Sequence, residues 1–289
     1  MADIRVVTDS ACDLPSALAE EHGIEVVPLT IRFGDEELVD RRDLSPKEFW
    51  ARVQNSPVLP ETAAPSPGAF EEAYRRAADA GCPGVVVCTL SSSLSATYQA
   101  AVVASQAVAD VIPVRVMDTR AVTMSEGMMA VAAARAASQG KGIEDVCGVV
   151  EDMVARTRLY ATLDTLENLK KGGRVGGAQA LIGSLLSIKP VIELRDGVVE
   201  AESKQRTRSK SFRYLVDKVR ECGAVENVAV MHGEAPDIEE FIDLLAAVVP
   251  REQMTVSDVG AVIGAHAGPR VIGVTFQVQD AQVPHAPTS

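Results

Sequence analysis

Apolar runs alternate with helical patterns along the first half of the chain. Short runs rich in Val, Ile and Leu predict strands buried on both faces, and the segments between them repeat apolar residues at helical spacing. The predicted strands are 4–9, 84–90 and 113–118, and the predicted helices are 13–22, 46–54, 67–80, 93–109, 125–138 and 143–155. Because buried strands separated by helices are typical of parallel sheets, we expect an α/β domain with a parallel sheet over residues 1–157.

Two segments interrupt this alternation. Residues 25–33 alternate apolar and polar positions, and Gly34-Asp35 leads into 37–39, so a hairpin insertion is predicted near 25–60. The segment 56–67 holds four prolines. Proline lacks an amide donor and restricts the residue before it, so we predict an irregular loop there.

The second half of the chain has a different pattern. Its predicted strands are 159–163, 228–232, 254–259 and 271–277, and its predicted helices are 207–221 and 237–248. Asp196-Gly197, flanked by alternating residues, predicts a further hairpin. We therefore expect an α+β domain over 158–280 and a disordered tail over 281–289.

The composition narrows the possible functions. The 289 residues carry 28 Lys and Arg against 40 Asp and Glu, a net charge of −12, and only 4% are aromatic. Such a chain lacks the basic surface and the stacking side chains that nucleic acids require. No signal peptide or long apolar span is visible, so we expect a cytoplasmic protein without integral membrane contact. The five scattered cysteines and four dispersed histidines indicate neither a disulfide framework nor a metal site.

Hydroxyl groups follow a predicted strand at the edge where ligands gather in an open α/β sheet. The turn after Leu90 reads Ser-Ser-Ser-Leu-Ser-Ala-Thr-Tyr over residues 91–98. A serine at a helix start commonly caps the helix, yet four serines exceed what one cap needs. Hydroxyls and free amides at such a place suit an anionic group such as a carboxylate or a phosphate.

Other polar residues have a structural interpretation beside a functional one. Thr62, in the Pro-rich segment, fits an exposed turn residue as well as a ligand contact. His266, in Gly-Ala-His-Ala-Gly-Pro, fits a hydrogen-bonded turn as well as a ligand contact. Asp9-Ser10 and Asp13 are expected to be turn and cap residues.

Two basic clusters stand out on this acidic chain. They are Lys170, Lys171 and Arg174 among the glycines of 169–177, and Arg206, Arg208 and Lys210 at alternating positions. Alternation places the second set on one side if that segment is extended. Each cluster is either a solvated charged surface or a docking patch for an anionic partner or phosphate.

These motifs together resemble the DegV family of bacterial fatty-acid-binding proteins, and they occur in the family's order. The matching segments are Val-Thr-Asp-Ser-Ala-Cys-Asp-Leu-Pro (7–15), Val-Pro-Leu (27–29), Thr-Ala-Ala-Pro-Ser-Pro (62–67), Ser-Ser-Ser-Leu-Ser-Ala-Thr-Tyr (91–98), Lys-Gly-Gly-Arg-Val (171–175), Ile-Lys-Pro (188–190), Arg-Thr-Arg (206–208) and His-Ala-Gly-Pro (266–269). Several are weak individually, but the ordered set is specific.

The resemblance implies a lipid-binding protein that is not itself an enzyme. A fatty acid would lie between two domains, its carboxylate held by Thr62 and Ser95 with His266 close by. The protein would need no cofactor and no metal. It would hand the fatty acid to a separate ATP-dependent kinase subunit that forms acyl phosphate for phospholipid synthesis, with Arg206 implicated in that partnership. We expect a monomer.

Three departures from the family pattern bear on the site. Ala63-Ala64 replace Ser-Gln, Ala96 replaces a glycine of the Ser-rich turn, and Arg270 replaces the last glycine of Gly-Pro-Gly. The geometry around the head group and the rim of the pocket are the features these changes could alter.

Two other functions remain open at this point. A serine hydrolase would use Ser95 with His266 and an acid such as Asp9 or Asp118, and it would need an oxyanion hole beside them. A regulator that binds a phosphosugar or a nucleotide would use the glycine-rich basic loop 169–177.

Overall fold

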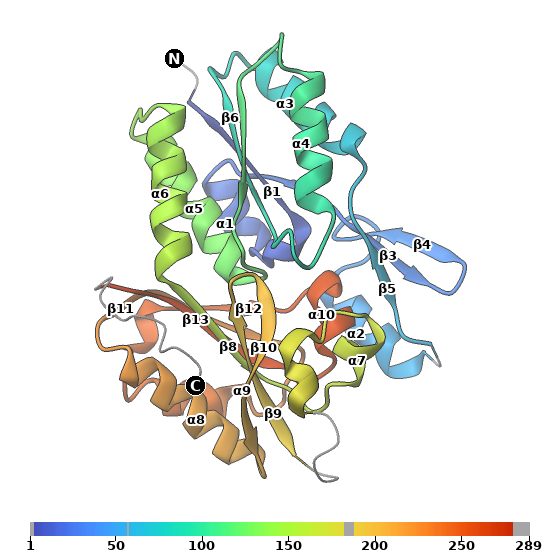
Figure 1. The fold of residues 1–289 in the computed structure, drawn as a ribbon, viewed down its shortest axis with the longest axis vertical. Coiled ribbons are helices and arrows are strands. Elements are labelled where there is room, and N and C mark those ends of the chain that lie inside the picture. The colour runs from blue at the N-terminus through green and yellow to red at the C-terminus, as the bar shows by residue number, and fades with distance from the viewer. Residues whose placement is uncertain (1–2, 57, 182–187, 280–289) are drawn as a thin grey trace.

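A four-stranded parallel sheet forms the centre of the N-terminal half in the computed structural model, which describes residues 3–56, 58–181 and 188–279 (Figure 1). Its order is β2-β1-β6-β7, and all three neighbouring pairs run parallel. The strands are Arg5–Asp9 (β1), Glu25–Val27 (β2), Val85–Thr89 (β6) and Val114–Asp118 (β7). The predicted parallel sheet is therefore confirmed, and β2 adds a fourth strand at its edge.

Helices cover both faces of this sheet (Figure 1). They are α3 (Pro67–Asp79) and α4 (Thr97–Ala107) on one face, and α5 (Met124–Ser138) and α6 (Ile143–Arg156) on the other. Along β6, Val85 and Val87 join the buried cluster that contains Phe70, while Val86 and Cys88 join the cluster on the opposite face. Since both faces are buried, the strand is apolar from Val85 to Cys88.

The insertion differs from its prediction in two places. Its elements are β3 (Thr30–Phe33), β4 (Glu36–Val39), α2 (Pro46–Asn55) and β5 (Glu61–Ala63), and the small sheet has the order β4-β3-β5. Residues 25–33 do not form one strand, because Pro28 cannot donate to a ladder and separates β2 from β3. The expected loop 56–67 contains the three-residue strand β5, since Pro60 and Pro65 lie outside the three residues that pair with β3.

Two predicted helix starts are also wrong. The helix expected over 93–109 begins at Thr97, because the serine-rich residues before it form turns that bond to other loops. Asp13 does not cap α1 (Ser16–Glu21), whose first turn follows Pro15 without a side-chain cap. Asp13 instead ends the short helix η1 (Ser10–Cys12) with a positive φ of 50°.

The C-terminal half is built on a six-stranded mixed sheet of order β10-β9-β8-β13-β11-β12. The strands are Thr157–Thr162 (β8), Lys189–Arg195 (β9), Val198–Gln205 (β10), Val225–His232 (β11), Met254–Asp258 (β12) and Ile272–Val278 (β13). The helices are Glu167–Lys171 (α7), Gly176–Leu181 (η2), Arg208–Glu221 (α8), Ile238–Leu245 (α9), Arg251–Gln253 (η3) and Ala261–Ala267 (α10). β9 and β10 form the hairpin predicted at Asp196-Gly197, and the mixed α/β fold class is confirmed.

The two faces of the C-terminal sheet have different partners. Along β13, Val274 and Phe276 join a cluster with residues of α8 and α9, while Gly273 and Thr275 point to the opposite face. There the Ser125 hydroxyl of α5 donates to Thr275 Oγ1 at 2.7 Å. The N-terminal helices and the C-terminal sheet are therefore in direct contact on this face.

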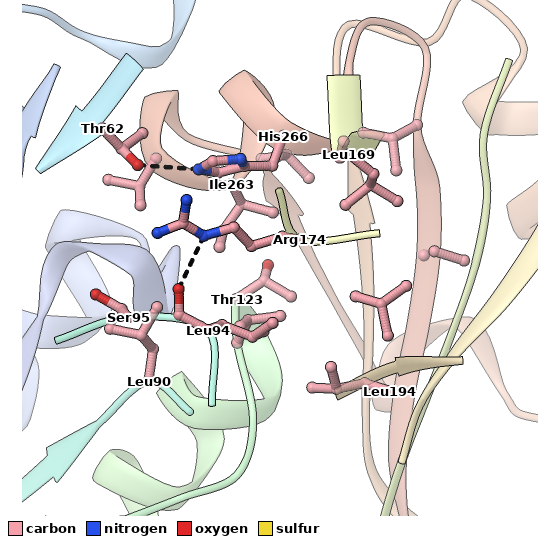
Figure 2. A pocket seen from close by; sticks show the side chains of 18 of the residues that line it. Thr62, Leu90, Leu94, Ser95, Thr123, Leu169, Arg174, Leu194, Ile263 and His266 are labelled. Atoms are coloured by element: carbon pink, nitrogen blue, oxygen red, sulfur yellow. Dashed lines mark hydrogen bonds between the residues drawn. The ribbon is translucent and has the colours of Figure 1, made fainter. Parts of the chain in front are cut away.

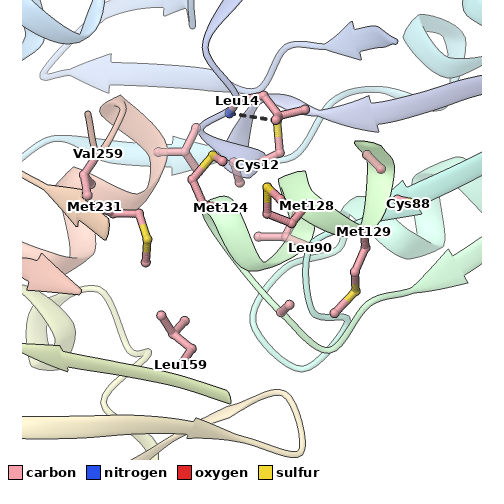
Figure 3. Close-up of a cluster of buried hydrophobic side chains, with 14 of the residues drawn as sticks. Cys12, Leu14, Cys88, Leu90, Met124, Met128, Met129, Leu159, Met231 and Val259 are labelled. Carbon is pink, nitrogen blue, oxygen red and sulfur yellow. Dashed lines mark hydrogen bonds between the residues drawn. The ribbon is translucent and has the colours of Figure 1, made fainter. Parts of the chain in front are cut away.

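One large buried cluster joins the two halves of the chain (Figure 3). Met124 and Met128 of α5 lie in it together with Leu14, Met231 and Val259. The boundary near residue 157 stays a prediction. The expected tail 281–289 lies outside the described residues. Over the described ranges, none of the helices combines the length and apolarity needed to cross a membrane.

Candidate functional site

Thr62 is positioned by the three-stranded sheet β4-β3-β5. It lies in the middle of β5 and pairs with Ile31 of β3. Ile31 is fully buried, which fixes the register of the pairing and thus the direction of the Thr62 side chain. The Pro-rich composition did not predict β5, yet this strand positions the Thr62 hydroxyl.

His266 lies in the last turn of α10, and residues distant in sequence fix the start of that helix. Asp13 Oδ1 accepts a hydrogen bond from the backbone N–H of Gly260 at 2.9 Å. A Cβ atom on Gly260 would lie 2.7 Å from the same oxygen, so glycine permits this close approach. Trp50 Nε1 donates to the carbonyl of Val259 at 2.9 Å. The orientation of α10 is therefore set by N-terminal residues.

Ser95 lies in the turn between β6 and α4. Asp9 anchors the start of this turn by accepting hydrogen bonds from the backbone N–H groups of Leu90 and Ala11, both at 2.9 Å. The Ser91 hydroxyl donates to the carbonyl of Gly197 at 2.7 Å. Asp9 and Ser91 thus have structural roles, as expected for Asp9, and Ser95 is left at the inner end of the turn.

The structure brings Thr62, Ser95 and His266 to one cavity (Figure 2). Thr62 Oγ1 and His266 Nε2 form a hydrogen bond of 2.9 Å. Ser95 Oγ instead bonds to the hydroxyl of Thr97 at 2.8 Å. The cavity has a volume of about 210 Å³, and these polar groups lie at one end of it.

Apolar side chains form the remainder of the cavity wall. Four neighbouring positions across the C-terminal sheet, Met231, Gly273, Ala161 and Ile192, line it in a row perpendicular to the strands. The two middle positions are glycine and alanine, so the space above the sheet is greatest between β8 and β13. Leu29, Leu90, Leu94, Val262 and Ile263 contribute from the other side. The cavity can therefore accept an apolar chain but few polar groups.

Arg174 adds a positive charge at the polar end. Figure 2 shows its side chain between the Thr62–His266 pair and Ser95. Its Nε donates to the carbonyl of Leu94 at 3.0 Å and its Nη1 to that of Gly172 at 2.6 Å. Among the described residues no carboxylate forms a salt bridge with it. A guanidinium without an anion in a partly buried wall favours an anionic ligand.

The environment of His266 keeps its imidazole neutral. Burial, and secondarily the charge of Arg174, lower the pKa of His266 to about 4. At neutral pH the ring therefore carries a proton on one nitrogen only. That nitrogen can donate a hydrogen bond, and the other nitrogen can accept one. Nδ1 has no hydrogen-bond partner among the described residues. It faces Gly172, where a Cβ atom would lie only 2.3 Å away.

Thr123 gives the wall a strained backbone. Its φ of 53° and ψ of −147° lie in a region that glycine favours, yet threonine is β-branched. Its backbone N–H donates to the carbonyl of Ala11 at 2.8 Å, which holds the conformation in place. Thr123 lines the cavity and is buried. Sequence reasoning had no means of finding it, because the strain depends on the packing of η1 against α5.

The basic residues near α8 do not lie together on one extended segment. The helix begins at Arg208 with Thr207 as its cap, so the segment is not extended across Arg206, Arg208 and Lys210. Arg208 is largely buried and bonds to Asp237 through Nε at 2.6 Å. Arg206 remains exposed. Only part of this cluster is therefore accessible to a partner.

The loop 169–177 likewise differs from a phosphate loop. Its first residues belong to α7, and Arg174 turns inward to the cavity. Among the described residues, no group of three or more His, Cys, Asp or Glu side chains could hold a metal ion. All five cysteines are free thiols.

The fold and the site define a mixed α/β protein with an apolar cavity that ends in hydroxyl, imidazole and guanidinium groups. The chain belongs to the DegV family, whose model, described as a family of uncharacterised proteins, matches residues 3–279. A DegV domain-containing protein of Streptomyces coelicolor is 41% identical over 276 residues, which cover 94% of this chain and 97% of that protein. The family resemblance seen in the motifs is confirmed.

Solved structures show the same fold. A fatty-acid-binding DegV family protein from Thermus thermophilus superimposes with a TM-score of 0.88 at 32% identity, covering 96% of this chain and 99% of that chain. DegV of Bacillus subtilis, described as a fatty acid binding protein, gives 0.85 at 30% identity with coverage of 96% and 100%. A stearic-acid-binding protein from Eubacterium ventriosum gives 0.81 at 26% identity with coverage of 95% and 98%.

Proposed function

We propose that this protein binds a long-chain fatty acid, with the acyl chain in the apolar cavity and the carboxylate at Thr62, Ser95 and His266. The observation that carries the proposal is the polar end of the cavity, where two hydroxyls, a neutral imidazole and Arg174 converge. Arg174 supplies the countercharge, and the smaller groups supply hydrogen bonds that orient the carboxylate. That several similar structures are described as fatty-acid-binding proteins supports the same ligand here.

The tail supplies most of the affinity in this proposal. Burial of one methylene contributes about 0.8 kcal/mol, so roughly fourteen methylenes contribute about 11 kcal/mol before the costs of association. A hydrogen bond to a charged group contributes about 1.5–3 kcal/mol. The head-group contacts therefore fix the position of the carboxylate more than they fix the overall affinity.

The cavity must widen to hold a long chain. Its volume of about 210 Å³ is below the roughly 300–1,000 Å³ of typical small-molecule sites. Leucine, isoleucine and methionine side chains line it. Met231 is the most adaptable of them because its chain is unbranched.

We further propose that the protein is a non-catalytic, monomeric subunit that presents the carboxylate to a separate ATP-dependent kinase. This role follows from the family resemblance of the motifs. The exposed Arg206 is compatible with docking to an acidic surface of that partner. The proposal involves neither a cofactor nor a nucleic acid.

The hydrolase alternative has no support in the geometry. His266 Nε2 bonds to Thr62, and the Ser95 hydroxyl bonds to Thr97. Asp9 bonds to backbone amides, and Asp118 accepts from the backbone N–H of Ser92 at 3.1 Å. A base beside the serine and an acid beside the base are both required for a triad, and the described residues provide neither.

Native mass spectrometry of the purified protein tests the binding proposal. We expect a co-purified fatty acid, and Thr62→Val and Ser95→Ala variants that bind it about tenfold more weakly each. Ser138→Ala, on the surface of α5, is the matched control and should bind like the parent protein. A protein that purifies free of lipid and shows no uptake of added palmitate would contradict the proposal.

A further inference from the structure

The short helix α10, which carries His266, ends in a carbonyl group that its own helix cannot satisfy. The last carbonyl groups of an α-helix lack partners within it, and α10 spans only Ala261–Ala267. The carbonyl of Ala265 would normally accept from the N–H of the residue four positions on. That residue is Pro269, which has no N–H. The end of α10 therefore needs a donor from another part of the chain.

Asn168 of α7 supplies this donor. Its side-chain Nδ2 donates to the carbonyl of Ala265 at 3.1 Å, although the two residues lie 97 positions apart in the sequence. Asn168 is only 8% exposed, so water cannot easily replace the bond. The helices α7 and α10 lie side by side (Figure 1). The hydrogen bond thus joins them one residue before His266.

Two glycines let α7 and α10 approach each other around this bond. A Cβ atom on Gly268 would lie 3.3 Å from Cγ and Oδ1 of Asn168. The carbonyl of Asn168 accepts from the backbone N–H of Gly172 at 2.8 Å. A Cβ atom on Gly172 would lie 3.1 Å from that carbonyl oxygen and 2.3 Å from His266 Nδ1. The end of α7 therefore forms one wall of the space that holds the His266 ring.

The His266 ring has little else to fix its direction. Its Nε2 bonds to Thr62 Oγ1 at 2.9 Å, and its Nδ1 has no hydrogen-bond partner among the residues that the structure describes. The direction of the ring therefore depends on the placement of α10. Asp13 and Trp50 hold the start of this helix, as described above. Asn168 holds its end.

We propose that Asn168 is a positioning residue for the fatty-acid carboxylate, because its amide holds the end of α10 against α7 and so keeps the His266 imidazole beside Thr62. This inference rests on the proposed function, since it concerns the head-group end of the same cavity. Asn168 is not among the residues that line the cavity. It therefore acts through His266 and not through contact with the ligand.

Two substitutions of Asn168 test this role by displacement of a fluorescent fatty acid. Asn168→Leu removes the donor at similar size. We expect it to bind laurate and palmitate about tenfold more weakly each, because the loss concerns the carboxylate and not the tail. Glu167→Gln, at an exposed position of the same helix, is the matched control and should bind like the parent protein.

Asn168→Asp keeps the shape of the side chain but cannot donate while its carboxylate is ionised. Burial beside a carbonyl favours the protonated form, which can donate again. Compared with the parent protein at the same pH, this variant should therefore bind palmitate about tenfold more weakly at pH 8 and within about threefold at pH 5.5. The pH comparison also decides the matter if Asn168→Leu does not fold.

A second background shows whether Asn168 acts through His266. In a His266→Ala protein, Asn168→Leu should change palmitate affinity by less than about twofold, since no ring remains to be positioned. A further tenfold loss there would overturn the inference, because Asn168 would then support the cavity as a whole. Parent-like binding by Asn168→Leu, a larger loss for palmitate than for laurate, or an equal loss for Asn168→Asp at both pH values would also overturn it. Failure of the parent protein to bind either acid would instead overturn the proposed function.

Discussion

The imidazole of His266 occupies space that exists only because residue 172 is glycine. A Cβ atom on Gly172 would lie 2.3 Å from His266 Nδ1 and 2.9 Å from Cε1. The backbone φ of Gly172 is −75°, which any residue can adopt. The requirement for glycine here is therefore one of space and not of backbone conformation.

Gly172→Ala should displace the imidazole and weaken the Thr62–His266 hydrogen bond. We expect fatty-acid affinity to fall about tenfold, measured by displacement of a fluorescent fatty acid. Gly173→Ala is the matched control, since its added methyl group meets no atom within 4 Å, although its φ of +71° adds backbone strain. A Gly172→Ala protein that binds like the parent would show that the position of the ring is unimportant.

A double variant separates a positioning role from a general packing defect. If Gly172 acts through His266, then Gly172→Ala should have little further effect in a His266→Ala background, where no ring can clash. Additive losses in the two variants would contradict that role, because independent sites add.

The pKa of His266 gives a direct measure of the electrostatics of the site. Burial and the charge of Arg174 lower this pKa to about 4. In NMR titrations the ring should therefore stay neutral well below pH 6. Arg174→Gln should raise the pKa partway toward its usual value, since burial, the larger cause, remains. A bound carboxylate should raise it as well, because a nearby negative charge favours the imidazolium. A ring that titrates near 6.5 in the unliganded protein would contradict this description.

The sequence was sufficient for the architecture but not for the small elements that position the site. Buried strands such as Val85–Thr89 have continuous apolar runs, and these were found within two residues of their bounds. The strand Glu61–Ala63 was missed because local composition reports only on local conformation. Its pairing with β3 depends on residues thirty positions away, among them Ile31. Thr62 was identified through its motif, and the reason for its position came from the structure.

The role of Arg174 could not be derived from spacing. A basic residue among glycines suggests an exposed loop, and only the path of the loop after α7 turns the side chain inward.

Arg270, which replaces a glycine of the family pattern, does not take part in the site. Its φ of 61° is one that glycine favours, and its guanidinium lies 3.6 Å from both Asp164 and Asp237. The replacement thus combines a strained backbone with two long ion pairs, and its side chain is not part of the cavity wall.

Substitution of the exposed Arg206 distinguishes docking to the kinase partner from fatty-acid binding. Arg206→Glu should leave palmitate affinity within about twofold, because the residue does not line the cavity. Turnover by the kinase partner should fall by at least fivefold at a fixed, subsaturating protein concentration, since charge reversal turns attraction to an acidic surface into repulsion. Lys210→Glu, also exposed and nearby in sequence, shows whether the effect is local. Equal loss of palmitate binding and turnover would contradict the docking role.

Gly273 lines the cavity where the proposed acyl tail would lie. It lies in the sheet row between Met231 and Ala161, and an added Cβ atom would lie 3.1 Å from Met231 Cε. Gly273→Val would place two further methyl groups in the cavity. We expect the affinity for stearate to fall more than that for laurate, because the longer tail needs more of the cavity. Calorimetric titration with both acids measures the ratio. An equal loss for the two would indicate distortion of the sheet and not a shortened cavity.

Asp13 makes the stability of the protein depend on pH. Burial raises the pKa of this carboxyl to about 7, and the charge of Arg41 opposes that rise. The folded protein therefore retains a proton between about pH 4 and 7 that the unfolded chain releases. Stability from this group must fall as pH rises through that range. The lowered pKa of His266 acts in the opposite direction between about 4 and 6.5.

Comparison of Asp13→Asn with the parent protein isolates the contribution of Asp13 to the pH dependence of stability. His266 and the buried Asp9 contribute to that dependence in both proteins. Asparagine keeps an oxygen that can accept from Gly260 N–H but carries no charge. Urea denaturation at pH 5 and pH 8 should show the variant gaining stability relative to the parent as pH rises. Asp13→Ala leaves the buried N–H of Gly260 unpaired and should be about 1–3 kcal/mol less stable than Asp13→Asn at both pH values. A stability difference between Asn and Asp proteins that does not change with pH would mean that Asp13 is ionised throughout, in which case Arg41 outweighs burial.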